Sequence, residues 1–352
     1  MKVLMKGNEA IAEAAILAGC RHYFGYPITP QTEVAAYMSK KMPKIGGTFL
    51  QAESEIAAIN MVYGVSSTGH RVMTSSSSPG IALKCEGISY LAGADLPALI
   101  VNVQRGGPGL GGIQPSQSDY HLATKGPGHG DFHVLCLAPA SVQEMADLTA
   151  HAFDLAEKYR MPAMLLADGT MGQMMEPVTL PEPTDANNND KSWAVTGTNC
   201  ERKHNIINSL YLSPAELERL NFERFERYKL IEEKEAMWEE FMMEDAEICI
   251  VSYGITARIS RNAIVKAREM GIKVGMIRPI TVWPFPKKPL LAAADKVKGF
   301  ISVELNMGQM KDDIELAIRC KKPVELVHRV GGMIPSPDEV LAAIEKMNGG
   351  NE

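Results

Sequence analysis

Hydrophobic and polar positions along the chain form two alternating kinds of segment. Short apolar runs, rich in aliphatic and β-branched residues, have the length and composition of buried strands. They fall at residues 23–24, 71–74, 98–103, 134–137 and 163–167. Longer segments between them, such as residues 8–18, 55–65 and 141–158, carry apolar positions at helical spacing. Strands that alternate with helices predict an α/β fold with a mostly parallel sheet covered by helices on both faces.

The pattern changes between residues 181 and 245. Residues 181–190 are rich in proline, asparagine and aspartate, which is typical of a linker. A capping serine at Ser213, followed by proline and then glutamate, favours a helix start. An apolar stripe continues from there to Phe241. We therefore expect a long charged helix over residues 213–243 that docks on a domain or on a partner subunit.

From residue 246 the alternation of strands and helices resumes. The predicted strands are residues 248–252, 274–277, 299–303 and 325–327, and the predicted helices are residues 257–269, 312–319 and 338–347. This pattern predicts a second, smaller α/β domain. The sequence thus divides into a first domain over residues 1–180, a linker with a charged helix over residues 181–245, and a second domain over residues 246–352.

Composition and charge exclude several classes of protein. The 352 residues are 45% hydrophobic, which is enough to bury the cores of two domains. The net charge is −6 and the basic residues are dispersed, so neither nucleic acid nor an anionic membrane is an expected partner. The six cysteines lie far apart without a C-x-x-C pair, so we expect no iron–sulfur cluster in this chain. No segment approaches about 18 apolar residues, and we expect a reduced, cytoplasmic protein without a signal peptide.

Residues 25–32 follow a predicted strand and read Gly-Tyr-Pro-Ile-Thr-Pro-Gln-Thr. Thr29 can cap a helix that begins at Pro30. The free backbone N–H groups of such a helix would favour an anion, for example a substrate carboxylate. The alternative is an ordinary capped helix preceded by a cis or kinked Tyr26–Pro27 bond.

Glu55 opens the predicted helix over residues 55–65. Thiamine diphosphate enzymes need one carboxylate that hydrogen-bonds the aminopyrimidine ring, so that the exocyclic nitrogen of the ring becomes a base. A buried Glu55 could share a proton with that ring. A solvated Glu55 would only complement the helix dipole, which is the commoner role of a glutamate in a first turn.

Two loops that follow predicted strands offer further ligand groups. The serine run at residues 75–78 precedes a helix, where α/β proteins present small polar side chains to ligands, although a flexible turn is the alternative. The loop at residues 105–112 has five glycines and Arg105, whose planar guanidinium suits a carboxylate, although a lone arginine is usually a surface charge. This loop also fits G-x-G-x-x-G literally, but Pro108 and Pro115 leave no helix start, so we reject a dinucleotide site.

Two further segments resemble metal motifs only loosely. Ala167-Asp168-Gly169 lacks the first glycine of the Gly-Asp-Gly signature that holds magnesium and diphosphate. The spacing of His129 and His133 suits a metal only on a helix, and the glycines beside His129 argue against one. We therefore predict no metal ligand in this chain.

Six short motifs occur in the order that is typical of one enzyme family. They are Gly25-Tyr-Pro-Ile-Thr-Pro30, Glu53-Ser-Glu-Ile-Ala-Ala58, Ser78-Pro-Gly80, Val103-Gln-Arg-Gly-Gly-Pro108, Gln117-Ser-Asp119 and His129-Gly-Asp131. With them, the chain resembles the α-type subunit of 2-oxoacid:ferredoxin oxidoreductases over nearly its whole length. The resemblance implies a thiamine diphosphate pyrimidine-binding domain followed by a smaller α/β domain of the transketolase C-terminal type.

The resemblance also assigns roles to individual residues. The implied catalytic residues are Glu55, Thr29 and Arg105. The implied cofactor-binding residues are Tyr26, Pro27, Ile28, Glu55, Ser77, Ser78 and Pro79. The implied substrate-binding residues are Thr29, Arg105, Gln117 and Asp119. In this assignment Glu55 is the partner of the ring nitrogen, while Thr29 and Arg105 face the substrate.

The resemblance implies a chain that is active only with partners. Thiamine diphosphate would be shared with a β subunit that carries the diphosphate and Mg²⁺ site. The [4Fe-4S] clusters would lie in the β, γ or ferredoxin-like subunits, not in this chain, and the electrons would pass to ferredoxin. A 2-oxoacid would be oxidatively decarboxylated and coenzyme A would receive the acyl group.

The substrate preference is indicated by one departure within the family. Residues 107–111 read Gly-Pro-Gly-Leu-Gly, where members that use 2-oxoglutarate typically have Gly-Pro-Ser-Thr-Gly. This resembles the branched-chain type that acts on 3-methyl-2-oxobutanoate. The alternatives are the same reaction on pyruvate or 2-oxoglutarate, a thiamine-dependent decarboxylase or synthase that uses no ferredoxin, and a non-catalytic assembly subunit.

Overall fold

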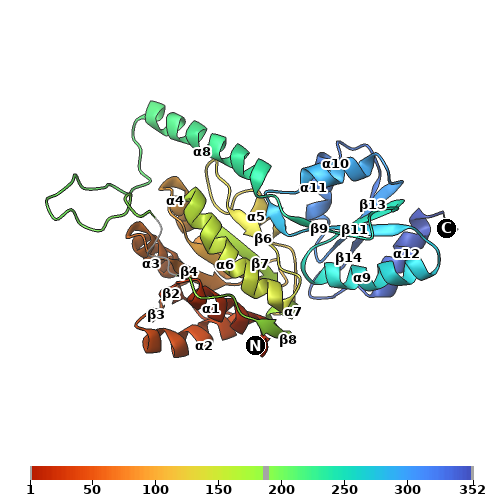
Figure 1. The fold of residues 1–352 in the computed structure, drawn as a ribbon, viewed down its shortest axis with the longest axis horizontal. Coiled ribbons are helices and arrows are strands. Elements are labelled where there is room, and N and C mark those ends of the chain that lie inside the picture. Colours follow the sequence, from red (N-terminus) through yellow and green to blue (C-terminus); the bar gives the residue numbers. More distant parts are fainter. Residues whose placement is uncertain (1, 185–189, 350–352) are drawn as a thin grey trace.

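The computed structural model describes residues 2–184 and 190–349. Two α/β domains lie side by side, and helix α8 (Pro214–Lys234) runs above the first of them in Figure 1. The fold class predicted from the sequence is confirmed, because both domains have mainly parallel sheets flanked by helices. None of the helices in the described ranges is both long and apolar enough to cross a membrane.

The first domain is built on a seven-stranded sheet with the order β12-β6-β7-β5-β4-β2-β3. Its parallel strands are β2 (His22–Gly25), β3 (Thr48–Gln51), β4 (Val72–Ser76), β5 (Leu99–Gln104), β6 (Leu135–Leu137) and β7 (Ala163–Asp168). The remaining strand, β12 (Thr281–Trp283), comes from the second half of the chain and pairs antiparallel with β6. The pairing of β12 with β6 therefore links the second half of the chain to the sheet of the first domain.

The polar loops of the first domain meet at one edge of this sheet. Strands β2, β4 and β5 are neighbours and parallel, so their carboxyl ends lie on the same edge. The loops that follow them are residues 26–31, Ser77 and residues 105–112. In open α/β sheets this edge is where ligands bind.

Helices cover the sheet, and a short antiparallel ribbon closes one side of the first domain. The helices are α1 (Gly7–Leu17), α2 (Thr32–Lys41), α3 (Glu55–Ser67), α4 (Ser78–Gly93), α5 (Tyr120–Thr124), α6 (Val142–Tyr159) and α7 (Gly169–Gln173), with a 3₁₀ turn η1 (Met42–Ile45). Helix α1 packs on α6, and α3 packs on α4. The ribbon pairs β1 (Lys2–Lys6) with β8 (Met175–Thr179).

The start of helix α2 corrects one sequence prediction. The helix begins at Thr32 with Gln31 at its N-cap, so Thr29 is not a helix cap and Pro30 is not the first helical residue. The cis peptide bond of this segment joins Thr29 to Pro30. The buried Gln31 donates a hydrogen bond to the Tyr26 carbonyl oxygen at 3.3 Å, which closes the loop before the helix.

The second domain has a five-stranded sheet with the order β14-β13-β10-β11-β9. Its strands are β9 (Trp238–Phe241), β10 (Ile248–Val251), β11 (Val274–Pro279), β13 (Gly299–Glu304) and β14 (Val324–His328). Its helices are α9 (Gly254–Glu269), α10 (Lys287–Ala294), α11 (Gln309–Ala317) and α12 (Pro337–Met347). All pairs are parallel except β11 with β9.

The charged helix is shorter than the sequence predicts. Helix α8 ends at Lys234, and Trp238 and Phe241 belong to strand β9 instead of the helical stripe. Residues three apart fit one helical face, but tertiary pairing with β11 overrides that pattern here. Within the helix, Tyr228 and Ile231 are buried, so its second half docks on the first domain.

Candidate active site

A cavity of about 480 Å³ opens at the sheet edge where the loops meet. It is lined by Pro27, Ile28, Thr29, Thr32, Glu55, Pro79, Gly80, Leu83, Arg105 and Leu110. Six of these were assigned a role from the sequence, namely Pro27, Ile28, Thr29, Glu55, Pro79 and Arg105. One common wall is thus formed by four segments: the loop after β2, the start of α3, the start of α4 and the loop after β5.

Glu55 is a buried carboxylate without a hydrogen-bond partner in the described part of the chain. Ser54 caps α3 by accepting a hydrogen bond from the Ala57 amide at 3.1 Å, and this places Glu55 in the first turn. The side chain is only 6% exposed and lines the cavity. A buried polar group ordinarily has a partner. Glu55 is therefore available to a ligand.

Gly80 explains how Glu55 fits beneath helix α4. A Cβ atom at Gly80 would lie 2.6 Å from Glu55 Oε1 and 2.1 Å from Ser76 Oγ. No side chain fits between these groups, so glycine lets the backbone of α4 pass directly over the carboxylate. The carboxylate is thus positioned by the packing of two helices and the end of β4.

Arg105 lies on the other side of the cavity and is fixed by backbone oxygens. Its Nη1 donates to the Thr29 carbonyl oxygen and its Nη2 to the Leu110 carbonyl oxygen, both at 3.0 Å. Its Nε is buried and has no hydrogen-bond partner within residues 2–184 and 190–349. These bonds hold the guanidinium beside Thr29 without neutralising its charge, which leaves a cation facing the cavity.

The four serines at the end of β4 and the start of α4 have different surroundings. Ser75 joins Tyr23 and Gln31 in a buried chain of hydrogen bonds, with distances of 2.7 and 2.5 Å. The hydroxyl groups of Ser76 and Ser77 are buried and have no hydrogen-bond partner in the part of the chain that the structure describes. Ser78 donates to Asp119 Oδ2 at 2.6 Å, away from Glu55. The unpaired hydroxyls lie at the end of β4 that leads to the cavity.

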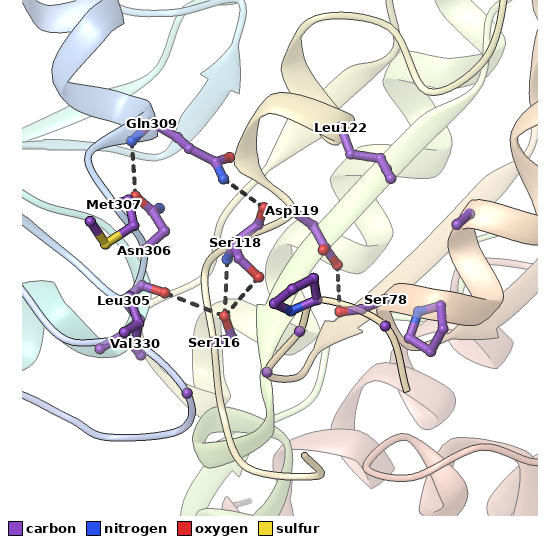
Figure 2. A pocket seen from close by; sticks show the side chains of 17 residues that line it. Ser78, Ser116, Ser118, Asp119, Leu122, Leu305, Asn306, Met307, Gln309 and Val330 are labelled. Carbon is purple, nitrogen blue, oxygen red and sulfur yellow. Dashed lines mark hydrogen bonds between the residues drawn. The ribbon is translucent and has the colours of Figure 1, made fainter. Parts of the chain in front are cut away.

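A second, larger cavity of about 800 Å³ lies between the two domains and shares Pro79 with the first (Figure 2). Ser116 Oγ contacts the Leu305 carbonyl oxygen at 3.3 Å, and Gln309 Nε2 donates to the Ser118 carbonyl oxygen at 2.8 Å. Asp119 lines this interdomain cavity and not the cavity of Glu55. Burial raises the pKa of Asp119, although the hydrogen bond that it accepts from Ser78 acts in the opposite direction.

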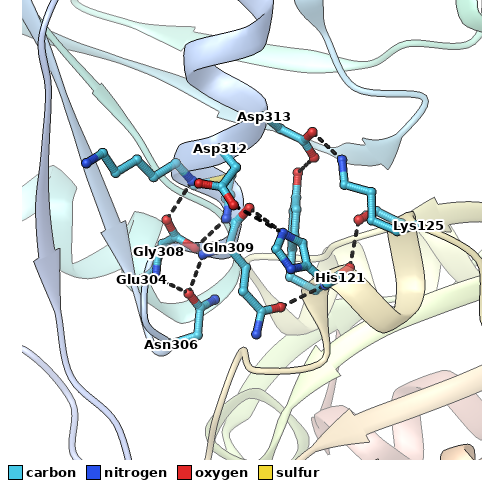
Figure 3. Close-up of polar contacts among 12 residues, drawn as sticks. His121, Lys125, Glu304, Asn306, Gly308, Gln309, Asp312 and Asp313 are labelled. Atoms are coloured by element: carbon cyan, nitrogen blue, oxygen red, sulfur yellow. Dashed lines mark hydrogen bonds and ion pairs between the residues drawn. The ribbon is translucent and has the colours of Figure 1, made fainter.

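Polar contacts between α5 and α11 hold this cavity together (Figure 3). Lys125 forms an ion pair with Asp313, which also accepts a hydrogen bond from the Tyr120 hydroxyl at 2.7 Å. The buried Glu304 carboxylate accepts hydrogen bonds from the Met310 and Lys311 amides at 2.8 and 2.9 Å, at the start of α11. Burial raises the pKa of Glu304 despite these bonds.

Gln117 contributes to the domain contact. It is fully buried, its Nε2 donates to the Tyr253 carbonyl oxygen at 2.9 Å, and its Oε1 accepts from the Leu305 amide at 3.0 Å. It lines neither cavity. Its assignment to substrate binding stays a prediction, as do all the other residue roles assigned from the sequence.

The metal lookalikes have structural partners. Asp168 caps α7 by accepting hydrogen bonds from the Thr170 and Met171 amides at 2.9 and 3.0 Å. His133 stacks on Trp283, with ring centroids 4.6 Å apart. In the described ranges, no group of three or more His, Cys, Asp or Glu side chains is placed to hold a metal ion.

One residue of the site was missed in the sequence. Lys84 is fully buried in α4, one turn after Gly80. It stands in the buried stripe formed by Ile81, Gly87 and Leu91, so its helical spacing was the available signal. A lysine in an apolar stripe is almost never fully buried without a partner.

Comparison with known families identifies this arrangement. Residues 13–234 match the family described as pyruvate flavodoxin/ferredoxin oxidoreductase, thiamine diP-binding. Residues 246–340 match pyruvate:ferredoxin oxidoreductase core domain II. The chain therefore belongs to the thiamine-dependent 2-oxoacid:ferredoxin oxidoreductase family, and the resemblance seen in its motifs is confirmed.

Within this family the chain is similar to α-type subunits along its whole length. It is 51% identical to the ketoisovalerate oxidoreductase subunit VorB of Methanothermobacter thermautotrophicus, with 98% of each chain covered. It is 35% identical to the 2-oxoglutarate synthase subunit KorA of the same organism, again with 98% of each chain covered.

Solved structures agree with the fold. The 2-oxoglutarate:ferredoxin oxidoreductase from Magnetococcus marinus superposes with a TM-score of 0.86 at 29% identity. The match covers 98% of this chain and 65% of that one. A split-gene transketolase superposes with a TM-score of 0.62 at 13% identity, which shows a shared fold alone.

Proposed function

We propose that this chain holds the aminopyrimidine side of thiamine diphosphate in a branched-chain 2-oxoacid:ferredoxin oxidoreductase. The reaction is the oxidative decarboxylation of 3-methyl-2-oxobutanoate to an acyl-coenzyme A, with electrons passed to ferredoxin. The observation that carries the proposal is Glu55, a buried carboxylate without a hydrogen-bond partner in the described residues, on the wall of a cavity.

The residues of the cavity fit an aminopyrimidine ring. Ser76 adds a buried hydroxyl near Glu55 that has no partner among the described residues, and Gly80 lets a flat group approach the carboxylate. Pro27, Ile28, Leu83 and other apolar residues line the rest of the cavity. Such a surface, apolar with a few convergent polar groups, is typical of a cofactor site. When bound, thiamine diphosphate supplies the electron sink for decarboxylation.

Three residues of the chain would bind and orient the cofactor ring and the substrate. Glu55 would share a proton with the ring nitrogen through one hydrogen bond, which would fix the ring and set its basicity. Arg105 presents a guanidinium to the substrate carboxylate, and its bonds to backbone oxygens keep it oriented for that contact. Thr29 stands beside it and helps to orient the same carboxylate.

A partner subunit would complete the cofactor site. The described residues hold no cluster suited to a metal ion, so we assign the diphosphate, its Mg²⁺ and the [4Fe-4S] clusters to partner chains. Ile56, Leu83 and Leu110, which neighbour or line the cavity, are 50%, 51% and 84% exposed. Exposed apolar side chains around a polar site are typical of an interface. They support closure of the cavity by a β subunit.

The lining also supports a branched-chain substrate. Among the described lining residues Arg105 is the only cation, so the cavity offers one carboxylate partner and an apolar surround. A substrate with a second carboxylate, such as 2-oxoglutarate, would leave that charge without a partner, at a cost of desolvation. The 51% identity with a ketoisovalerate oxidoreductase subunit points the same way.

The test uses the complex co-purified with its native partners. Reduction of a viologen dye is followed without oxygen, with coenzyme A and each of 3-methyl-2-oxobutanoate, pyruvate and 2-oxoglutarate. We expect preference for the branched acid and its loss in Glu55→Gln. Glu53→Gln is the matched control, because Glu53 is exposed two residues earlier and should keep full turnover.

The alternatives give distinct outcomes. Turnover that is intact in Glu55→Gln would indicate a non-catalytic assembly subunit. Preference for another acid would correct the substrate. Decarboxylation without coenzyme A-dependent dye reduction, in a complex with intact clusters, would indicate a decarboxylase or synthase that uses no ferredoxin.

A further inference from the structure

Lys84 is a charged side chain enclosed by the first domain. It is 0% exposed, and its only hydrogen bond among the described residues goes from Nζ to Thr74 Oγ1 at 3.0 Å. One hydrogen bond to a neutral hydroxyl does not offset the desolvation free energy of a buried ammonium, because moving a charge out of water costs far more than one such bond contributes. A buried Lys84 therefore needs either a negative charge nearby or the loss of its proton, which would leave a neutral amine.

The helix pair shows where that counter-charge lies. A Cβ atom at Gly80 would touch Glu55, and a Cβ atom at Gly87 would lie 2.4 Å from Ile59 Cγ2. The contact face of α4 on α3 therefore runs through Gly80 and Gly87. Lys84 stands between them, four residues after one and three before the other, so it lies on the same face.

Strand β4 completes the surroundings of Lys84. Thr74 and Ser76 are two residues apart in the strand, so their side chains project from the same face of the sheet. Thr74 contacts Lys84, and Ser76 lies next to Gly80 and Glu55. Lys84 and Glu55 thus lie along the same face of β4, with the side chains of Thr74 and Ser76 beside them.

The charged groups around Lys84 are few. On α3 the ionisable neighbour is Glu55, whose charge acts on Lys84. Strand β4 offers the hydroxyls of Thr74 and Ser76, and the neighbouring strand β5 offers the uncharged amide of Asn102. Burial lowers the pKa of Lys84 from 10.5 to about 8, and the negative charge of Glu55 opposes that fall.

We infer that Lys84 is a positioning residue for Glu55: its ammonium lies on the same face of α4 beneath the cavity and holds the carboxylate in place by charge attraction. Burial by itself disfavours a charged carboxylate, and a nearby cation favours it. A carboxylate would accept a hydrogen bond from the ring nitrogen only while that nitrogen carries a proton, so the charge and position of Glu55 both matter to the ring. The inference rests on the proposed role of Glu55 and adds the residue that positions it.

Two variants of the co-purified complex test this inference. Lys84→Met keeps the length of the side chain and removes the charge. We expect it to weaken the affinity for thiamine diphosphate by about tenfold at neutral pH, measured by calorimetry. Lys84→Met on a Glu55→Gln background should change nothing further, because the carboxylate on which it acts is gone.

The wild-type complex gives a test that needs no variant. Its cofactor affinity should fall above about pH 8, where Lys84 loses its proton, and Lys84→Met should lack this alkaline limb. A wild-type affinity that stays flat through this pH range would overturn the inference. Equal losses from Lys84→Met with and without the Glu55 carboxylate would do the same, because a packing defect acts in both backgrounds.

Failure of this inference is distinguishable from failure of the proposed function. If Glu55→Gln abolishes turnover while Lys84→Met has wild-type affinity at every pH, Glu55 keeps its role and Lys84 has none. If Glu55→Gln leaves turnover intact, the proposed function itself is wrong.

Discussion

Substituting Gly80 with alanine should damage the site far more than the fold. A Cβ atom at this position would lie 2.6 Å from Glu55 Oε1, and ordinary contact begins at 3.4 Å, so the carboxylate oxygen must move by about 0.8 Å. A misplacement of about 1 Å in a catalytic group can cost about a hundredfold in rate. We therefore expect about a hundredfold lower dye reduction in Gly80→Ala, with weaker binding of thiamine diphosphate.

The cost to stability should stay small at Gly80. The atoms that the new methyl group meets are the ends of the Glu55 and Ser76 side chains, which can rotate away. The alanine also improves helix propensity by about 0.5–1 kcal/mol. The free energy of unfolding, measured with urea, should thus change by less than about 1 kcal/mol.

Two other glycines of the same helix pair are controls. At Gly87 the new Cβ would lie 2.4, 2.8 and 3.2 Å from Cγ2, Cγ1 and Cβ of Ile59, a stiff side chain that cannot move aside. Gly87→Ala should destabilise by about 1–3 kcal/mol through overpacking and leave cofactor affinity less affected. At the exposed Gly64 no atom lies within 4 Å, so Gly64→Ala should stabilise slightly.

The comparison between these variants is what tests the reasoning. If Gly80→Ala turns over like wild type, the carboxylate of Glu55 does not need its observed position. If Gly80→Ala and Gly87→Ala lose activity in proportion to their loss of stability, the effect is one of folding and not of the site.

Four further measurements follow from individual groups. Burial lowers the pKa of Lys84 to about 8, so between about pH 8 and pH 10.5 the unfolded chain binds one proton more than the folded chain. The free energy of unfolding of wild type should therefore rise by about 3 kcal/mol as the pH increases over this range. Urea titrations of Lys84→Met should lack this rise. Burial raises the pKa of Asp168 to about 6, so the free energy of unfolding of wild type should fall by about 3 kcal/mol as the pH increases from about 4 to about 6. Asp168→Asn, which keeps an oxygen to accept the hydrogen bond at the start of α7, should not show this fall. Arg278 is 3% exposed and donates to Glu144 at 2.6 and 2.9 Å across the domain contact, so Arg278→Met should lower the urea midpoint by the equivalent of about 2 kcal/mol, and an unchanged midpoint would contradict this. Arg105→Ala should raise the Michaelis constant for the 2-oxoacid about tenfold or more while changing cofactor affinity less, whereas equal losses would remove its substrate role.

Much of the first domain could be predicted because its signals are local. Apolar runs such as residues 98–103 become fully buried strands, here β5, and a run of that length has few other possible structures. Once the strands are parallel, their carboxyl ends share one edge. The convergence of Thr29, Glu55 and Arg105 on one cavity therefore follows from the order of the motifs along the chain.

The features that could not be predicted depend on contacts between distant segments. Strand β12 has three residues and β9 has four, and each owes its conformation to pairing with a strand far away in the sequence. Gln117 stands in a motif that suggests a ligand group, but the second domain takes up its hydrogen bonds. Local patterns carry no information on such partners.

The contact between α3 and α4 separates stability from chemistry. Toward the middle of the pair, Gly87 and Ile59 are packed as in any core, and their contact fixes the distance between the helices. One and two turns earlier on the same face of α4, Lys84 and Gly80 replace apolar side chains by a charge and by a gap, and Glu55 occupies that gap. A core residue at either place would stabilise the helix pair but would close or neutralise the site. The buried charge and the missing Cβ cost stability, and the proposed role of Glu55 gives a physical reason for both, because Gly80 leaves room for the carboxylate at the cavity and Lys84 places a cation on the same face of α4.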